Sequence, residues 1–195
     1  MARPALYSRP VADLPIDLDA GLSEQLARVL DVEGKIPRAL EALGPVAGRD
    51  VILVDGPGGI RARQLTELGA RVTLVDSSAP LPFDAPEQLA EAARVLRPGG
   101  RLLVVHDYGR DDVSVLRGPL PEHGPWSRPD GPFLGKGFKI RVIHCWWTYD
   151  SIESARSFLA DAFGIAGTEF GAELTRPRLS YNVAVYHRTL GEEHP

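Results

Sequence analysis

The sequence predicts an α/β fold in which helices cover both faces of a doubly wound, mostly parallel sheet. Two apolar runs, 50–55 and 101–106, have the length of a strand and lack polar alternation, which is typical of parallel strands buried on both faces. Segments with a helical spacing of apolar residues separate these runs from each other and from another predicted strand, 71–75. Strands that alternate with helices form right-handed βαβ units, so the pattern favours a parallel sheet.

The N-terminal region is expected to hold an irregular arm and two helices. Residues 1–19 contain three prolines, three aspartates and no apolar run, which predicts an irregular arm. Apolar side chains recur three and four positions apart from 21 to 31 and again from Ile36 to Leu43, which predicts two helices. A Gly-Pro pair directly after Leu43 ends the second helix.

Turn residues delimit the next elements. The glycine turn Gly56–Gly59 follows the first strand, and a helix then runs to Gly69 before the second strand. Asp84 with Glu87 three residues later resembles a capping box, so another helix is expected to begin there. A Pro-Gly-Gly turn at 98–100 then leads into the third strand.

The segment 107–136 is predicted to be a loop or lid, with one helical turn at 112–116. It is long for a connection without regular structure, and such segments are often lids or interface elements. Trp126 and Phe133 within it need burial. We therefore expect the segment to fold over the cleft or onto a partner subunit.

The C-terminal part is expected to add two strands and a helix. The strands are predicted at 138–147 and at 179–187, where apolar and polar residues alternate. Asp150 and Glu153 have the spacing of a capping box, and the helix that follows is expected to end at Gly164. The stretch between that helix and the last strand fits neither pattern.

Composition limits the function classes. A chain of 195 residues predicts a single domain, and the net charge of −4 argues against a general nucleic-acid binder. Cys145 is the single cysteine, so neither a disulfide framework nor a cysteine metal site is expected. The first residues do not resemble a signal peptide, and no run approaches the length of a membrane span. These features predict a cytoplasmic protein without a membrane or metal partner.

The glycine turn and one acid predict a nucleotide site. Gly56, Gly58 and Gly59 allow a ligand close to the backbone, and the following helix offers free N–H groups at its start. Asp76 lies twenty residues beyond Gly56 at the end of the second strand, where a carboxylate can bind ribose hydroxyls. These residues alone do not separate NAD from S-adenosylmethionine, and a plain tight turn with a solvated acid is the alternative.

An NAD site agrees poorly with the details of the sequence. The third glycine of a G-x-G-x-x-G motif would fall on Arg61. No Tyr-x-x-x-Lys pattern occurs in the chain, since Tyr149 is followed by Glu153 and Tyr108 by Asp112 at that spacing. A short-chain dehydrogenase is therefore not expected.

Two longer segments resemble the class I S-adenosylmethionine-dependent methyltransferases. EQLAEAARVLRPGGRLLVVHDYGRDD is similar to a late helix, turn and strand of that family, and RALEALGPVAGRDVILVDGPGG to its entry helix and first motif. The resemblance implies a Rossmann-like fold, S-adenosylmethionine as cofactor and a small-molecule methyl acceptor. It also implies that Asp55, Gly56, Gly58, Gly59 and Asp76 bind the cofactor.

The chain departs from the family pattern in two places. The first motif is usually acid-x-Gly-x-Gly-x-Gly, whereas here Val54 holds the acid position and Ile60 the third glycine, or else Asp55 replaces the first glycine. The family also has two more strands between the acid and the RPGG turn, but only seven residues separate Asp76 from Asp84. About one βαβ unit is thus missing, and the third strand is expected to pair directly with the first.

The candidate catalytic residues follow the third strand. His106, Asp107 and Tyr108 lie at its carboxyl end, where ligand sites gather in such sheets, and could act as a base or substrate clamp. Their alternative role is to hydrogen-bond the loop backbone. Trp146 and Trp147 are adjacent on a strand and must face opposite ways, so at most one faces the cleft.

These observations leave more than one function open. The first is methyl transfer to a small molecule, and the second is a catalytically inactive methyltransferase fold kept as a binding or dimerisation module. A third is a different nucleotide-binding enzyme on the same framework. The strand at 71–75 would form a sheet edge, and because unguarded edges invite pairing, a homodimer is expected.

Overall fold

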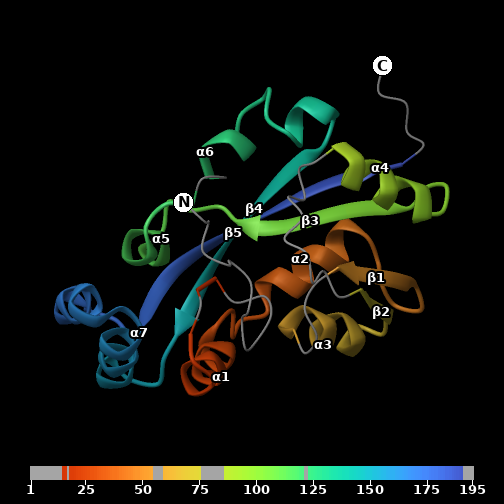
Figure 1. Cartoon of the computed structure of the whole chain (residues 1–195). Helices are drawn as coiled ribbons and strands as arrows, with labels where there is room; N and C mark the ends of the chain where they lie inside the picture. The colour runs from red at the N-terminus through yellow and green to blue at the C-terminus, as the bar shows by residue number, and fades with distance from the viewer. Residues whose placement is uncertain (1–14, 17, 55–58, 76–85, 121–122, 191–195) are drawn as a thin grey trace.

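A computed structural model describes residues 15–16, 18–54, 59–75, 86–120 and 123–190 (Figure 1). The elements follow in the order α1 (Ala20–Val29), α2 (Lys35–Leu43), β1 (Asp50–Val54), α3 (Ile60–Glu67), β2 (Arg71–Val75), α4 (Pro86–Val95), β3 (Arg101–Asp107), α5 (Asp112–Arg117), α6 (His123–Trp126), the short 3₁₀ helix η1 (Leu134–Lys136), β4 (Lys139–Thr148), α7 (Ile152–Glu173) and β5 (Arg178–Thr189). These bounds confirm an α/β protein.

The described strands form two separate sheets. β1 and β2 pair in parallel, while β5 lies between β3 and β4 and runs antiparallel to both. The ladders run from Asp50↔Arg71 to Val54↔Val75, from Arg101↔Thr189 to Asp107↔Val183, and from Lys139↔His187 to Thr148↔Arg178.

Two expectations about the sheet are therefore wrong. β3 pairs with β5 and not with β1, and β1–β2 is the single parallel pair among the described strands. The physical reason is the length of β5, whose 12 residues form a ladder with both neighbours. A short apolar run shows that a strand is buried but does not encode the direction of its neighbour.

The small parallel sheet is covered by a helix on one face. Val51 and Val72 pack against a small cluster that includes Leu65 of α3. On the other face, Ile52 and Val54 are 48% and 43% exposed. The expectation that 50–55 is buried on both faces is thus wrong, because no described helix packs on this second face.

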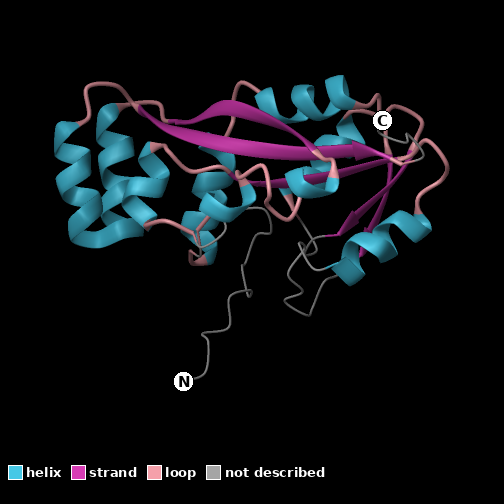
Figure 2. Cartoon of the chain, turned by 90° about the horizontal axis from the view of Figure 1, so that it is seen from above, coloured by secondary structure: helices cyan, strands magenta, loops and turns pink. Residues whose placement is uncertain are grey.

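The antiparallel sheet carries the main core on one face and a smaller cluster on the other. α1, α2, α5 and α7 pack on one face around Trp147, Tyr181 and Val183. The other face holds a smaller aromatic cluster that includes Phe133 and Tyr186. Figures 1 and 2 place α7 at one end of the long strands and the parallel pair at the other.

The helix α7 begins and turns at identifiable residues. Ser151 and Ser154 form the capping box, with Ser154 N–H donating to Ser151 Oγ at 3.0 Å, so the predicted Asp150–Glu153 box is wrong by one position. The predicted end at Gly164 coincides with its non-helical backbone (φ 60°, ψ −130°). A second helical stretch follows, and the two halves lie side by side in Figure 2.

The segment predicted to be a loop or lid contains α5, α6 and η1. Trp126 and Phe133 are buried, as expected, and their rings meet edge to face with centroids 4.8 Å apart. Most of the N-terminal arm lies outside the described residues, but Ile16 is buried in the main core. None of the described helices has the length and apolar character that crossing a membrane would require.

Candidate functional site

The predicted catalytic residues lie where β3 ends, on alternating sides of the sheet. Asp107 faces the main core, next to Tyr181 of β5. His106 faces the opposite side, where its ring lies 4.4 Å from that of Trp126. Tyr108 packs against the same aromatic cluster as Trp126. The structure therefore does not bring the three together in one site, because successive side chains of a strand point to opposite faces.

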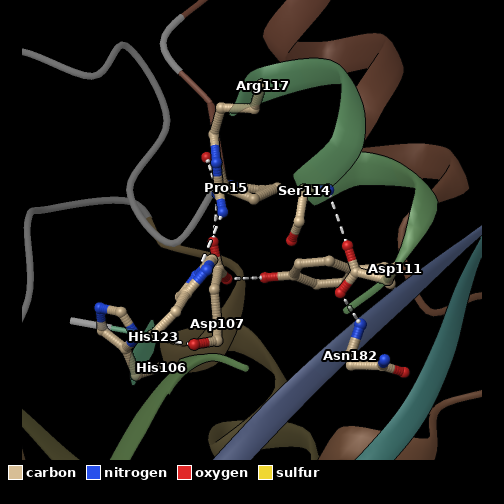
Figure 3. Close-up of polar contacts among 9 residues, drawn as sticks. Pro15, His106, Asp107, Asp111, Ser114, Arg117, His123 and Asn182 are labelled. Carbon is tan, nitrogen blue, oxygen red and sulfur yellow. Dashed lines mark hydrogen bonds and ion pairs between the residues drawn. The ribbon is translucent and has the colours of Figure 1, made fainter. Parts of the chain in front are cut away.

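Asp107 is held by two side chains that sequence reasoning did not identify. Arg117 of α5 forms an ion pair with Oδ2, and both side chains are only 13% exposed. Tyr181 donates a hydrogen bond to Oδ1. Arg117 also donates to the backbone oxygen of Pro15 at 2.7 Å, as Figure 3 shows. With both oxygens engaged, Asp107 orders its neighbours and is not free to act as a base.

The Tyr181 hydroxyl remains a hydrogen-bond donor to Asp107. Burial first, and then the adjacent Asp107 carboxylate, raise the pKa of Tyr181 well above its usual value. The phenol therefore stays protonated near neutral pH. Sequence spacing gave no indication of this contact, since Tyr181 lies 74 residues after Asp107.

His123 joins this cluster from α6 and was also missed by sequence reasoning. Its ring occupies the space beside Gly109, where a Cβ atom would lie 2.6 Å from Nδ1. Arg117 approaches His123 Nε2 at 3.5 Å. Burial and then the positive charge of Arg117 lower the pKa of His123, which favours a neutral imidazole near neutral pH.

A cavity of about 570 Å³ opens beside His123 at the end of β3. Its lining includes Tyr108, Arg110, Asp112, Val115, His123 and Ser180. Tyr108 lines this cavity, whereas His106 and Asp107 are not among its described lining residues.

Two aspartates in the cavity wall serve the local fold. Asp111 caps α5 by accepting from Ser114 N–H at 2.7 Å, and its other oxygen accepts from Asn182 N–H at 2.7 Å. Asp112 accepts from both the N–H and the hydroxyl of Ser180, each at 2.7 Å. These hydrogen bonds fix the start of α5 and join it to β5.

The predicted cofactor residues are described only in part. Asp55, Gly56, Gly58 and Asp76 lie outside the described residues. Gly59 is buried and forms the N-cap of α3, whose start has no side-chain cap.

The first turn of α3 interacts electrostatically with the Asp107 cluster. Arg61 is only 6% exposed, donates to Gln64 Oε1 at 2.7 Å and interacts electrostatically with Tyr181. Ile60 belongs to the same hydrophobic core as Tyr181. The start of the predicted cofactor helix and the end of β3 are therefore neighbours.

The two tryptophans of β4 and the nearby His144 have structural partners. Trp147 is fully buried, whereas Trp146 is half-buried with the guanidinium of Arg178 4.2 Å from its ring centre. His144 Nδ1 donates to the side-chain oxygen of Asn182 at 2.8 Å. Within the described ranges, no group of three or more His, Cys, Asp or Glu side chains could hold a metal ion.

Comparisons with protein-family models, with curated proteins and with solved structures find no match for this chain.

Proposed function

We propose that this protein is an S-adenosylmethionine-dependent methyltransferase that acts on a small molecule. The observation that carries the proposal is the electrostatic interaction between the two predicted halves of the site. Arg61, in the first turn of the helix after the glycine turn, interacts with Tyr181, which in turn binds Asp107 at the end of β3. A cofactor at the glycine turn and an acceptor in the cavity would therefore be near each other.

The described residues fit such a cofactor. No described side chain caps the start of α3 at Gly59, and the N–H groups at a helix start are suited to bind a ligand. Asp55, Gly56, Gly58, Gly59 and Asp76 would hold S-adenosylmethionine, which supplies an activated methyl group. Transfer then depends mainly on orienting the acceptor.

The residues at the end of β3 take different roles in this proposal from those first expected. Asp107 is a positioning residue, because Arg117 and Tyr181 occupy both of its oxygens. Tyr108 would contact the acceptor from the cavity wall. The neutral imidazole of His123, in the same wall, is suited to accept a proton from the acceptor.

Calorimetric titration with S-adenosylhomocysteine tests this function. We expect micromolar binding by the wild-type chain and a loss of about tenfold or more in Asp76→Ala, since the carboxylate would bind the ribose. Glu67→Ala is the matched control, because Glu67 is exposed on α3, and it should bind like wild type. Absence of heat at about millimolar ligand would refute the proposal.

A second function has one observation in its favour. Ile52, Val54 and Val75 expose an apolar face on a parallel pair of strands, and parallel sheets are ordinarily covered on both faces. An inactive module that dimerises through this region would cover it. Sedimentation equilibrium should then show a dimer that Ile52→Lys dissociates, whereas Val32→Lys, at an exposed site elsewhere, leaves it intact. A monomeric wild-type chain would contradict this function.

A further inference from the structure

We propose that the cavity at the end of β3 binds a small organic carboxylate with a flat apolar body, and that Arg110 is the residue that recognises the carboxylate. As the identity of the methyl acceptor, this inference rests on the proposed function. As a binding site, it rests on the contacts of Arg110 and the walls of the cavity, and does not depend on the proposed function.

Arg110 is a cation without a carboxylate partner among the described residues. It is exposed at the cavity wall, and its guanidinium carbon lies 5.4 Å from the centre of the Tyr108 ring. The carboxylates of Asp111 and Asp112 are next in sequence but accept hydrogen bonds from α5 and β5 instead. No described carboxylate therefore pairs with the charge of Arg110.

The backbone of Arg110 is held in a conformation that arginine rarely adopts. Its φ is 58°, which is in the left-handed region and is unfavourable for a residue with a Cβ atom. Asn182 holds this backbone conformation, because its side-chain amide donates to the backbone oxygens of both Gly109 and Arg110 at 3.1 Å.

Asn182 is itself fixed by its neighbours. Its side-chain oxygen accepts from His144 at 2.8 Å, and its N–H donates to Asp111 at 2.7 Å. A strained residue persists only where the surrounding structure determines it, and such residues cluster at ligand sites. The network thus places Arg110 at the cavity before any ligand arrives, which lowers the entropy cost of binding.

The cavity walls indicate the class of ligand. A volume of about 570 Å³ suits a small molecule. The ring of Tyr108, together with Val115 and Pro119, offers apolar surface to a flat body. A guanidinium binds a carboxylate through two parallel N–H···O bonds. Because Asp111 and Asp112 place negative charge in the same wall, a monoanion fits this cavity better than a doubly charged phosphate.

Titration of the full chain with benzoate, benzamide and phenyl phosphate tests the proposal. These probes share the ring but differ in charge. We expect benzoate to bind with a Kd of about 1 mM or below, at least about tenfold tighter than benzamide. Equal affinity for benzoate and benzamide would overturn the role of charge. Tighter binding of phenyl phosphate would overturn the choice of a carboxylate, and no binding of any probe at about 10 mM would overturn the site.

A matched pair of variants assigns the effect to Arg110. Arg110→Asn removes the charge but tolerates positive φ, so the fold should be retained while benzoate binding falls by about tenfold or more. Arg128→Asn removes an exposed arginine that does not line the cavity, and binding should be unchanged. Benzoate affinity that survives in Arg110→Asn would refute the assignment.

The same variant separates this inference from the proposed function. Arg110→Asn should bind S-adenosylhomocysteine like wild type, since Arg110 is not one of the cofactor residues. Benzoate binding without S-adenosylhomocysteine binding would support the carboxylate site and refute methyl transfer. The reverse result would support the cofactor site and overturn the carboxylate site.

Discussion

The Tyr181 hydroxyl donates a hydrogen bond to Asp107 across the antiparallel pair of β3 and β5. Asp107 is directly opposite Val183, so Tyr181 reaches it diagonally from two positions along the same face. Arg117 holds the other carboxylate oxygen and also binds the oxygen of Pro15. A single carboxylate thus joins β3, β5, α5 and the residues before α1.

Replacement of Tyr181 by phenylalanine should destabilise the fold. Asp107 would lose a donor in a largely buried position, and hydrogen bonds to charged groups contribute about 1.5–3 kcal/mol. The free energy of unfolding, measured by urea titration, should fall by an amount in this range. An unchanged midpoint in Tyr181→Phe would contradict the structural role of the pair.

Tyr149 supplies the matched control for that substitution. Its hydroxyl is buried without a hydrogen-bond partner among the described atoms, and burial raises the pKa of Tyr149. Tyr149→Phe removes a desolvated polar group and no contact, so stability should be unchanged or increase by about 1 kcal/mol. A loss as large as that of Tyr181→Phe would show that ring repacking, and not the hydrogen bond, causes the effect.

The imidazole of His123 should make stability depend on pH. Its folded-state pKa lies below the ordinary value of 6.5, so the unfolded chain binds more protons between the two values. The free energy of unfolding should therefore fall as pH drops below about 6.5. Denaturant titrations at several pH values should show a smaller fall in His123→Gln than in wild type. Identical pH profiles for the two proteins would contradict the prediction.

His187 should contribute a second, independent part of that pH dependence. Burial and then the charges of Arg101, Lys139 and Arg141 lower its pKa. The sign is the same as for His123, so His187→Gln should also flatten the profile on the acid side. The double variant should be flatter than either single variant, and a double variant identical to one of them would show that the two groups are coupled.

Cys145 should be inert toward thiol reagents in the folded protein. It is 1% exposed, and burial raises its pKa to about 12 from the ordinary 9.0. The thiolate population at about pH 8 should be about a thousandfold below that of a free thiol. Labelling with a disulfide reagent should be slow in buffer and reach one equivalent in denaturant, because Cys145 is the sole cysteine. Rapid labelling of the native protein would contradict this burial.

A methyl group at Gly167 should disrupt the two halves of α7. A Cβ atom there would lie 1.9 Å from the backbone oxygen of Leu159, so the helices would have to separate. Gly167→Ala should lower the free energy of unfolding by about 3 kcal/mol. Gly124→Ala is the control, because no heavy atom lies within 4 Å of its added Cβ, and its effect should stay within about 0.5 kcal/mol. Equal stability of the two variants would contradict the close packing.

Local patterns in the sequence predicted the elements well, because helix and strand periodicity depends on neighbouring residues. The end of the first half of α7 at Gly164 followed from its glycine, and the burial of Trp126 and Phe133 followed from their size. The capping box was misplaced because Ser151 and Ser154 offer the same chemistry one position further along.

Pairing between distant strands was not predictable in the same way. The choice of β5 as the partner of β3 depends on contacts between residues far apart in sequence, for which a short apolar run carries no information. For the same reason Asp107 could be proposed for a site, but its partners Arg117 and Tyr181 could not. His123 was not predicted from sequence spacing, because the position of its ring depends on the absence of a side chain at Gly109.

The division into two sheets also predicts which part of the protein unfolds locally first. α3, β1 and β2 share a small core of their own around Val46, Leu65 and Ala70, apart from the main one. Regions with few buried contacts exchange their amide hydrogens through local unfolding at lower free energy than the rest. The amides of β1 and β2 should therefore exchange with solvent before those of β4 and β5. A ligand at Gly59 would bind only while α3, β1 and β2 are folded. Slower amide exchange in β1 would therefore show that the ligand site is occupied.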